Sequence, residues 1–163
     1  MKSVFLVGFM GSGKTSIAKA LQTKLSWKLQ DTDDMIVQEY KQSIPEIFKE
    51  RGEQVFRDYE SSVLKKTNLE QTIVATGGGI IEREENRKFL KQQEMVIYLD
   101  TSWEEINQRL SDDETRPIWS NENTDKKELL KARISKYKEV ADFIVKTDGK
   151  SVDEIANEII SFI

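Results

Sequence analysis

The 163-residue sequence contains no cysteine and no histidine. The lack of cysteine excludes disulfides and thiolate nucleophiles, and the lack of both removes the usual zinc ligands and the imidazole general base. Any catalysis must therefore use carboxylates, lysine, arginine, backbone amides and a hard metal ion. With a formal net charge of −4 the chain has no broad positive field, so we expect no nucleic-acid partner.

Long apolar runs are also missing. No stretch approaches the roughly 20 apolar residues that a membrane-spanning helix needs, so we expect no membrane association. The apolar segment before residue 8 is short and runs directly into a glycine-rich loop, which indicates a buried strand rather than a secretory signal. The length suits a single domain over residues 1–163, and we expect a monomeric cytoplasmic protein.

Short apolar segments alternate with helical patterns. Residues 3–7 form an apolar run that ends in glycine, and apolar residues recur at helical spacing from Lys14 to Leu25. Further strands are expected at residues 28–30, 72–75, 95–99 and 143–146. Capping pairs that mark helix starts are Ser43 with Glu46, Ser102 with Glu105, Asp125 with Glu128, and Ser151 with Glu154. This alternation predicts a three-layer α/β fold, with a five-stranded parallel sheet covered by helices on both faces.

The glycine-rich loop at residues 8–15 reads GFMGSGKT. Its glycines allow successive backbone amides to turn toward phosphate oxygens. Lys14 adds positive charge at the β- and γ-phosphates, and the Thr15 hydroxyl can coordinate Mg²⁺. An apolar strand precedes the loop and an amphipathic helix follows it, so we predict a P-loop that binds a nucleoside triphosphate. The predicted nucleotide-binding residues in this loop are Gly11, Ser12, Gly13, Lys14, Thr15 and Ser16.

Two carboxylates, Asp31 and Asp33, follow the second expected strand. On an extended segment this spacing directs both side chains to one side, although a turn would relax that rule. Taken alone, the pair could equally be the solvated acidic start of a helix.

More motifs follow in a set order. They are SIPEIF at residues 43–48, GEQVFRDYE at 52–60, GGG at 77–79, Arg109, Arg116 with Pro117, and Arg133 four residues before Tyr137. Together with the P-loop and the two carboxylates, this order and spacing closely resembles the shikimate kinase family over nearly the whole chain. The resemblance implies a P-loop kinase fold, with a substrate-binding segment at about 33–61 and a mobile lid at about 111–124. It also implies transfer of the γ-phosphate of ATP to the 3-hydroxyl of shikimate in aromatic amino-acid biosynthesis, with Mg²⁺ bridging the nucleotide phosphates.

The resemblance further implies roles for the acidic and basic side chains. Asp33 matches the catalytic carboxylate that orients or deprotonates the substrate hydroxyl, and Asp31 matches the residue that holds Mg²⁺ through water. The metal assignment has separate support, because residues 72–76 supply no carboxylate at the end of the third strand, where many P-loop enzymes place one. Arg57 and Arg133 match the pair that binds the substrate carboxylate, a task suited to the guanidinium fork.

The remaining roles implied by the resemblance concern backbone amides and the lid. Gly78 and Gly79 match positions where backbone amides approach substrate and phosphate. Arg116 resembles the lid arginine that, with Lys14, stabilises the transferred charge, and Arg109 resembles the residue that stacks against adenine. We also expect Glu60 to orient Arg57, because they lie three residues apart on one helix face. 

Several alternatives stay open. Arg109 could be a solvated surface charge, and GGG could be a flexible turn. The chain reads RPIW at residues 116–119 where the family often has Arg-Pro-Leu, and residues 146–150 lack an arginine often found there, so the adenine contacts beyond Arg109 are open. The alternative functions are a related small-acid kinase, such as a gluconate kinase, or a nucleotide-binding regulator without transfer activity.

Overall fold

A computed structural model describes residues 2–111 and 125–163. Its strands are β1 (Val4–Val7), β2 (Lys28–Asp31), β3 (Thr72–Ala75), β4 (Val96–Asp100) and β5 (Phe143–Lys146). Its helices are α1 (Lys14–Leu25), α2 (Thr32–Tyr40), α3 (Ile44–Arg51), α4 (Glu53–Leu64), the short 3-10 helix η1 (Ile80–Glu82), α5 (Glu84–Lys91), α6 (Trp103–Ser111), α7 (Lys126–Val140) and α8 (Val152–Ile160). Each expected strand forms, and its bounds differ from the prediction by at most one residue at either end.

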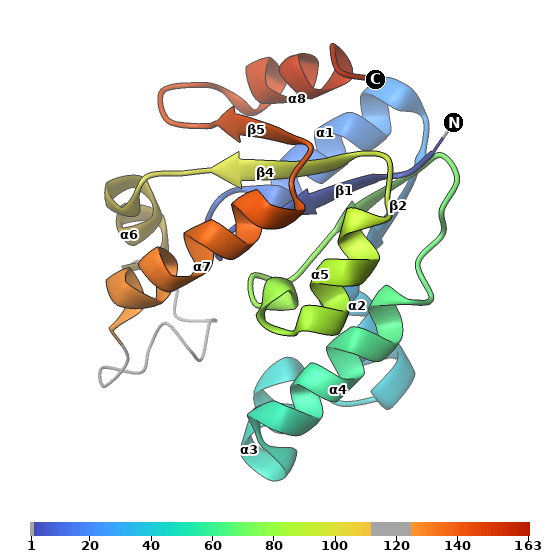
Figure 1. The fold of residues 1–163 in the computed structure, drawn as a ribbon, viewed down its shortest axis with the longest axis vertical. Helices are drawn as coiled ribbons and strands as arrows, with labels where there is room; N and C mark the ends of the chain where they lie inside the picture. The colour runs from blue at the N-terminus through green and yellow to red at the C-terminus, as the bar shows by residue number, and fades with distance from the viewer. Residues whose placement is uncertain (1, 112–124) are drawn as a thin grey trace.

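The strands form one parallel sheet in the order β2-β3-β1-β4-β5 (Figure 1). The first strand of the chain is therefore central, and Leu6 is paired with Ala75 of β3 on one side and with Ile97 of β4 on the other. Alternate residues of β1 face opposite sides of the sheet, because successive side chains of a strand point in opposite directions.

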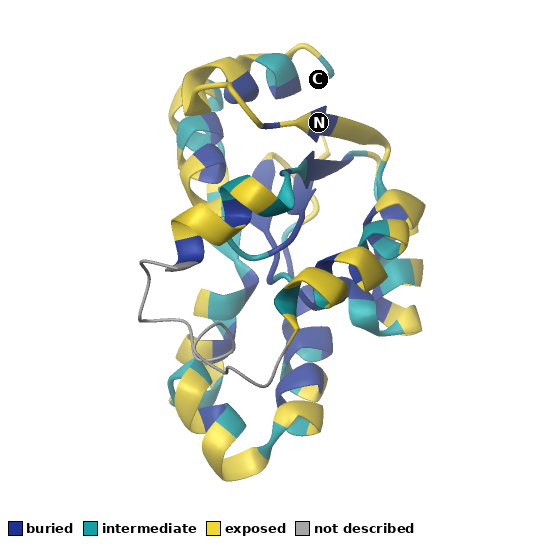
Figure 2. Cartoon of the chain, turned by 90° about the vertical axis from the view of Figure 1, so that its left-hand side faces the viewer, coloured by how far each residue is buried: buried dark blue, intermediate teal, exposed yellow. Residues whose placement is uncertain are grey.

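Helices cover both faces of the sheet, which confirms the predicted three-layer α/β fold. Phe5 and Val7 pack in a core with buried side chains of α4, α5, α6 and α7. Val4 and Leu6 pack in a second core with α1 and α8. Figure 2 shows the buried strands between these helical layers. A third, smaller core joins α2, α3 and α4, and it contains the buried ring of Phe56.

The helix starts follow the predicted capping pairs. The side chains of Ser43, Ser102, Asp125 and Ser151 accept hydrogen bonds from the backbone amides of Glu46, Glu105, Glu128 and Glu154, respectively. At Ser151 the Glu154 carboxylate also accepts a bond from the Ser151 amide, which completes a capping box. These local bonds fix where each chain segment turns from loop into helix.

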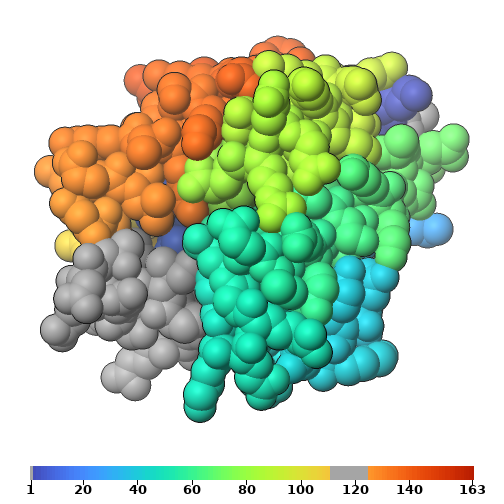
Figure 3. Space-filling view, turned by 60° about the horizontal axis from the view of Figure 1, so that its bottom comes forward, coloured from blue at the N-terminus to red at the C-terminus, as the bar shows by residue number. Residues whose placement is uncertain are grey.

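The loops that carry the predicted site residues follow the carboxyl ends of the strands. The P-loop follows β1, residues 31–33 follow β2, and residues 76–79 follow β3, so all three segments meet at one edge of the sheet. Figure 3 shows α4, α5 and α7 packed together on the face seen from below. Helices from both halves of the chain therefore converge on the loops that follow the strands.

Two sequence expectations concern the lid and the membrane. Arg116 and residues 112–124, which make up nearly all of the expected lid at 111–124, lie outside the described residues. Within the described residues, no helix combines the length and apolar character needed to cross a bilayer.

Candidate active site

A cavity of about 400 Å³ lies at the carboxyl edge of the sheet. It is bordered by the P-loop, by the ends of β2 and β3, and by residues of α6 and α8. The predicted site residues that line it are Gly11, Ser12, Gly13, Lys14, Thr15, Ser16, Asp31, Asp33, Gly78 and Arg109. The fold therefore brings together most of the positions singled out in the sequence.

The P-loop has the geometry of an anion site. Gly11 and Gly13 have φ angles of 82° and 93°, which side chains rarely allow. Gly13 precedes α1 without a side-chain cap, so the first amides of this helix stay available to a phosphate group. The Lys14 ammonium donates hydrogen bonds to the carbonyl oxygens of Gly8 and Phe9, the latter at 2.9 Å. These bonds hold the positive charge directly over the loop.

Asp31 has a structural role as well as a place in the cavity. It is the last residue of β2 and the N-cap of α2, and its Oδ1 accepts hydrogen bonds from the amides of Asp33 at 2.9 Å and Asp34 at 3.3 Å. The helix begins at Thr32, so the segment is not extended and the strand-spacing argument for Asp31 and Asp33 does not apply. Both carboxylates reach the cavity because the chain turns there.

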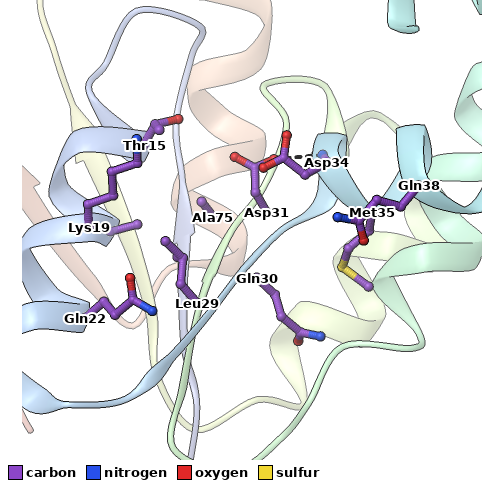
Figure 4. A pocket seen from close by; sticks show the side chains of 11 residues that line it. Thr15, Lys19, Gln22, Leu29, Gln30, Asp31, Asp34, Met35, Gln38 and Ala75 are labelled. Atoms are coloured by element: carbon purple, nitrogen blue, oxygen red, sulfur yellow. Dashed lines mark hydrogen bonds between the residues drawn. The ribbon is translucent and has the colours of Figure 1, made fainter. Parts of the chain in front are cut away.

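The donors near Asp31 fit Mg²⁺. Thr15 and Asp31 line the main cavity and also an adjoining cavity of about 360 Å³, in which the Asp31 and Asp34 carboxylates lie side by side across from Thr15 (Figure 4). Burial and the charge of Asp34 raise the pKa of Asp31, against the backbone hydrogen bonds and Lys14. One hydroxyl and one carboxylate suit Mg²⁺, which takes few protein ligands and completes its shell with phosphates and water.

Arg57 is held by two carboxylates of its own helix. Its guanidinium is 2.9 Å from Glu60 and 3.5 Å from Glu53, and the predicted pair with Glu60 is therefore present. The side chain is buried and lies 5.4 Å from the centre of the Phe56 ring. It packs so closely on Gly79 that a Cβ atom there would lie 2.6 Å from Cζ of Arg57. Glycine at this position makes room for the guanidinium.

Arg133 is almost fully buried on α7, with 3% of its surface exposed. Its Nε and Nη1 have no hydrogen-bond partner among the described residues, and the Glu82 carboxylate is 3.6 Å from Nε. Its Cζ lies 5.6 Å from the centre of the Phe9 ring, and Nη1 lies 3.7 Å from the Cβ position of Gly78. Because unsatisfied buried charged donors are costly, this arrangement points to an anionic ligand.

Glu60 and Asp33 both lie close to Gly77. A Cβ atom on Gly77 would be 2.9 Å from Oδ1 of Asp33 and 3.0 Å from Oε2 of Glu60. Glu60 is 1% exposed, and its burial raises its pKa to about 7 against the opposing charge of Arg57, with Asp33 adding to the rise. The side chains of Asp33, Arg57 and Arg133 therefore each lie beside a glycine of the loop at residues 77–79.

The far end of the cavity contains Arg109. Its guanidinium donates a hydrogen bond to the carbonyl oxygen of Gly11 at 2.9 Å and pairs with Glu105 at 3.2 Å. Lys150, Val152 and Ile155 also line this cavity. The sequence analysis left the contacts of residues 146–150 open, and it did not single out Val152 or Ile155. The signal was their place after β5, since the carboxyl ends of parallel strands meet at one edge.

Comparison with known proteins identifies the family. The shikimate kinase family model matches residues 10–163. A shikimate kinase from Bacillus cereus is 43% identical over 163 residues, covering 98% of this chain and 96% of that protein. One from Persephonella marina is 38% identical, covering 98% of each.

Solved structures agree with the sequence comparison. The shikimate kinase from Acinetobacter baumannii in complex with shikimate has a TM-score of 0.93 at 36% identity, covering 99% of this chain and 92% of that chain. The shikimate kinase from Aquifex aeolicus has a TM-score of 0.83 at 31% identity, covering 98% and 94%. The family model, the full-length relatives and these structures together show that the chain belongs to the shikimate kinase family.

Proposed function

We propose that the chain transfers the γ-phosphoryl group of ATP to the 3-hydroxyl of shikimate, giving ADP and shikimate 3-phosphate. Family membership makes the chain an ATP-dependent phosphotransferase. The observation that carries the proposal is the gathering of Asp33, Arg57 and Arg133 around one glycine loop beside the P-loop. This arrangement provides an anion-binding acceptor site next to a phosphate-binding donor site.

The donor side is formed by the P-loop and its metal residues. The amides of residues 11–16 and the ammonium of Lys14 bind the nucleotide phosphates and offset the charge that develops there. Thr15, directly, and Asp31, through water, would hold Mg²⁺, which supplies further charge neutralisation when bound. Arg109 stacks on the adenine base, and Lys150 and Val152, which line the same cavity, contribute to binding it.

On the acceptor side, positioning matters more than basicity. Arg57 and Arg133 bind the shikimate carboxylate, for which the buried and incompletely bonded guanidinium of Arg133 is suited. Asp33 accepts a hydrogen bond from the 3-hydroxyl and takes its proton as the hydroxyl oxygen bonds to phosphorus and the bridging oxygen leaves with ADP. Phosphoryl transfer through a loose transition state does not need a strong base, so the weak basicity of an aspartate suffices.

Parts of the proposal rest on the family resemblance. Arg116, in the lid at residues 111–124, closes over the phosphates and stabilises the transferred charge, while the exclusion of water protects ATP from hydrolysis. The segment at about 33–61 forms the substrate-binding part of a single domain over residues 1–163. The supply of ATP and Mg²⁺ that this reaction needs supports a cytoplasmic location.

A coupled assay of ADP release tests the proposal. ATP and Mg²⁺ are supplied with shikimate, with gluconate, or with no acceptor, and we expect turnover only with shikimate. An Asp33→Ala variant should retain ATP binding and lose this turnover. Turnover on gluconate alone would identify the related small-acid kinase, and tight ATP binding without acceptor-dependent turnover in the unsubstituted chain would identify a regulator.

A further inference from the structure

Tyr137 lies directly beneath the glycine loop. It is fully buried on α7, one helical turn after Arg133, and its hydroxyl donates a 2.6 Å hydrogen bond to the carbonyl oxygen of Gly78. Its ring stacks on Tyr98 of β4, with the ring centres 5.1 Å apart. This packing gives the hydroxyl a fixed place against the loop.

The orientation of the Gly78 carbonyl also determines the orientation of the Gly79 amide, which belongs to the same peptide unit. A peptide unit is planar, and its C=O and N–H point in opposite directions, so fixing the Gly78 oxygen also fixes the Gly79 N–H, directed away from Tyr137. Among the described residues, neither the Gly78 nor the Gly79 amide donates a hydrogen bond. The Gly78–Gly79 peptide thus presents an available donor between the two substrate arginines.

The glycine loop needs such an anchor. Arg57 fills the space that a side chain at Gly79 would need, and a Cβ atom at Gly78 would lie only 3.2 Å from the backbone nitrogen of Met10, so both positions disfavour a side chain that would restrict the backbone. Glycine samples a wide range of backbone angles, and a free peptide of this loop could rotate. Burial raises the pKa of Tyr137, so its hydroxyl remains protonated and able to donate.

We propose that Tyr137 is a positioning residue for the acceptor: its hydroxyl orients the Gly78–Gly79 peptide so that the Gly79 amide donates a hydrogen bond to shikimate. The inference rests on the proposed function, because shikimate is the ligand that receives this bond. Tyr137 itself does not touch the reacting atoms. Because the hydroxyl also interacts with the Arg133 side chain, protection of the Gly79 amide is the readout that is specific for the backbone donor.

Tyr137→Phe removes the hydroxyl and keeps the ring. We expect kcat/KM for shikimate to fall roughly 10-fold, with a raised KM for shikimate and an unchanged KM for ATP. A merely structural role would reduce the amount of active enzyme and leave both KM values unchanged. The matched control is Tyr98→Phe, which removes a buried hydroxyl that contacts Asp100 instead and should leave both KM values unchanged.

The outcomes separate this inference from the proposed function. No shikimate-dependent ADP release by the unsubstituted chain would overturn the function and with it the inference. Shikimate-dependent release by that chain, with wild-type KM values in Tyr137→Phe, would overturn the inference alone. If Tyr137→Phe does not fold, amide hydrogen exchange in the unsubstituted protein decides. The Gly79 amide should gain protection when shikimate is added, and no gain at saturation would overturn the inference.

Discussion

Arg133 combines deep burial with incomplete hydrogen bonding, which makes it costly to the fold. We expect Arg133→Met to raise the free energy of unfolding by about 1 kcal/mol, because the buried charge is removed while the side-chain length is kept. Glu82 retains its 2.9 Å pair with Lys136. The same variant should lose roughly 100-fold in kcat/KM for shikimate, since it lacks one of the two arginines that we propose to bind the shikimate carboxylate.

The control for this substitution is Arg83→Met. Arg83 pairs with Asp58 at the surface, so its loss should change stability by no more than about 0.5 kcal/mol and leave shikimate kinetics unchanged. Urea unfolding of both variants measures the difference. A larger loss of stability in Arg133→Met than in Arg83→Met would contradict the prediction.

Glu60 predicts a pH dependence of stability. Its pKa is raised from 4.5 to about 7, mainly by burial, with Arg57 opposing and Asp33 adding to the rise. Because the folded-state pKa exceeds the unfolded value, this contribution to stability is fully present at pH below 4.5 and is lost as the pH rises through 7. Glu60→Gln should remove this pH-dependent contribution. As the pH rises from acidic to neutral, the free energy of unfolding of the variant should therefore increase by about 1–3 kcal/mol relative to that of the unsubstituted chain. If the free energy of unfolding changed with pH in the same way in the variant and in the unsubstituted chain, Glu60 would not titrate as expected.

Among the contacts of single residues, the sequence predicted one within a helix and did not predict those between distant segments. The Arg57–Glu60 pair was predictable because both residues lie on one helix. The placement of Phe9 beside Arg133 was not, because the two are far apart in the sequence and meet only through tertiary packing. The same holds for Glu60 and Asp33, whose shared neighbour Gly77 follows a different strand.

Asp31 caps the start of α2 and is also the residue that we propose to hold Mg²⁺ through water. Asparagine caps helices about as well as aspartate, so Asp31→Asn should change the free energy of unfolding by less than about 0.5 kcal/mol, whereas Asp31→Ala should cost about 1 kcal/mol. Both variants lose the carboxylate and should need roughly 10-fold more Mg²⁺ for half-maximal turnover. Thermal unfolding and Mg²⁺ titration measure the two effects separately. An unchanged Mg²⁺ requirement in Asp31→Asn would remove Asp31 from the metal site.

The loop between β3 and η1 has no room for a side chain at its last glycine. In Gly79→Ala the new methyl group would displace Arg57, so kcat/KM for shikimate should fall roughly 100-fold while ATP affinity is retained. Gly52→Ala is the control: its φ of 87° strains any side chain, but no atom lies within 4 Å of the Cβ position. It should lose about 1 kcal/mol of stability and keep wild-type kinetics. The reverse pattern in the two variants would disprove this account of the loop.

Elements were predictable from local signals. Apolar runs located the strands to within one residue, and side-chain caps located the helix starts. The helix start at Thr32 was left open, because the acidic residues fitted an extended strand and the first turn of a helix equally well. The residues of α8 that line the cavity carry no motif, and their place after β5 was the one signal in the sequence that pointed to them.

For the whole molecule, ligand binding should appear as added stability. A ligand at 100 times its Kd stabilises the folded state by about 2.7 kcal/mol, which for a domain of this size is a rise in Tm of about 5–10 °C. We expect shikimate to produce such a shift in a thermal scan, and gluconate at the same concentration to produce none. Equal shifts with both compounds would show that the site recognises only a carboxylate.

The sheet order has a consequence for how the chain assembles during synthesis. β1 precedes both of its neighbours, since Val4 pairs with Ile73 and Phe5 with Val96. As the chain leaves the ribosome, the backbone hydrogen-bonding groups on both edges of the apolar strand β1 stay unpaired until β3 and β4 have been synthesised. Nascent chains that stall before β3 emerges would expose this strand, and we expect them to depend on chaperones far more than chains stalled after β4.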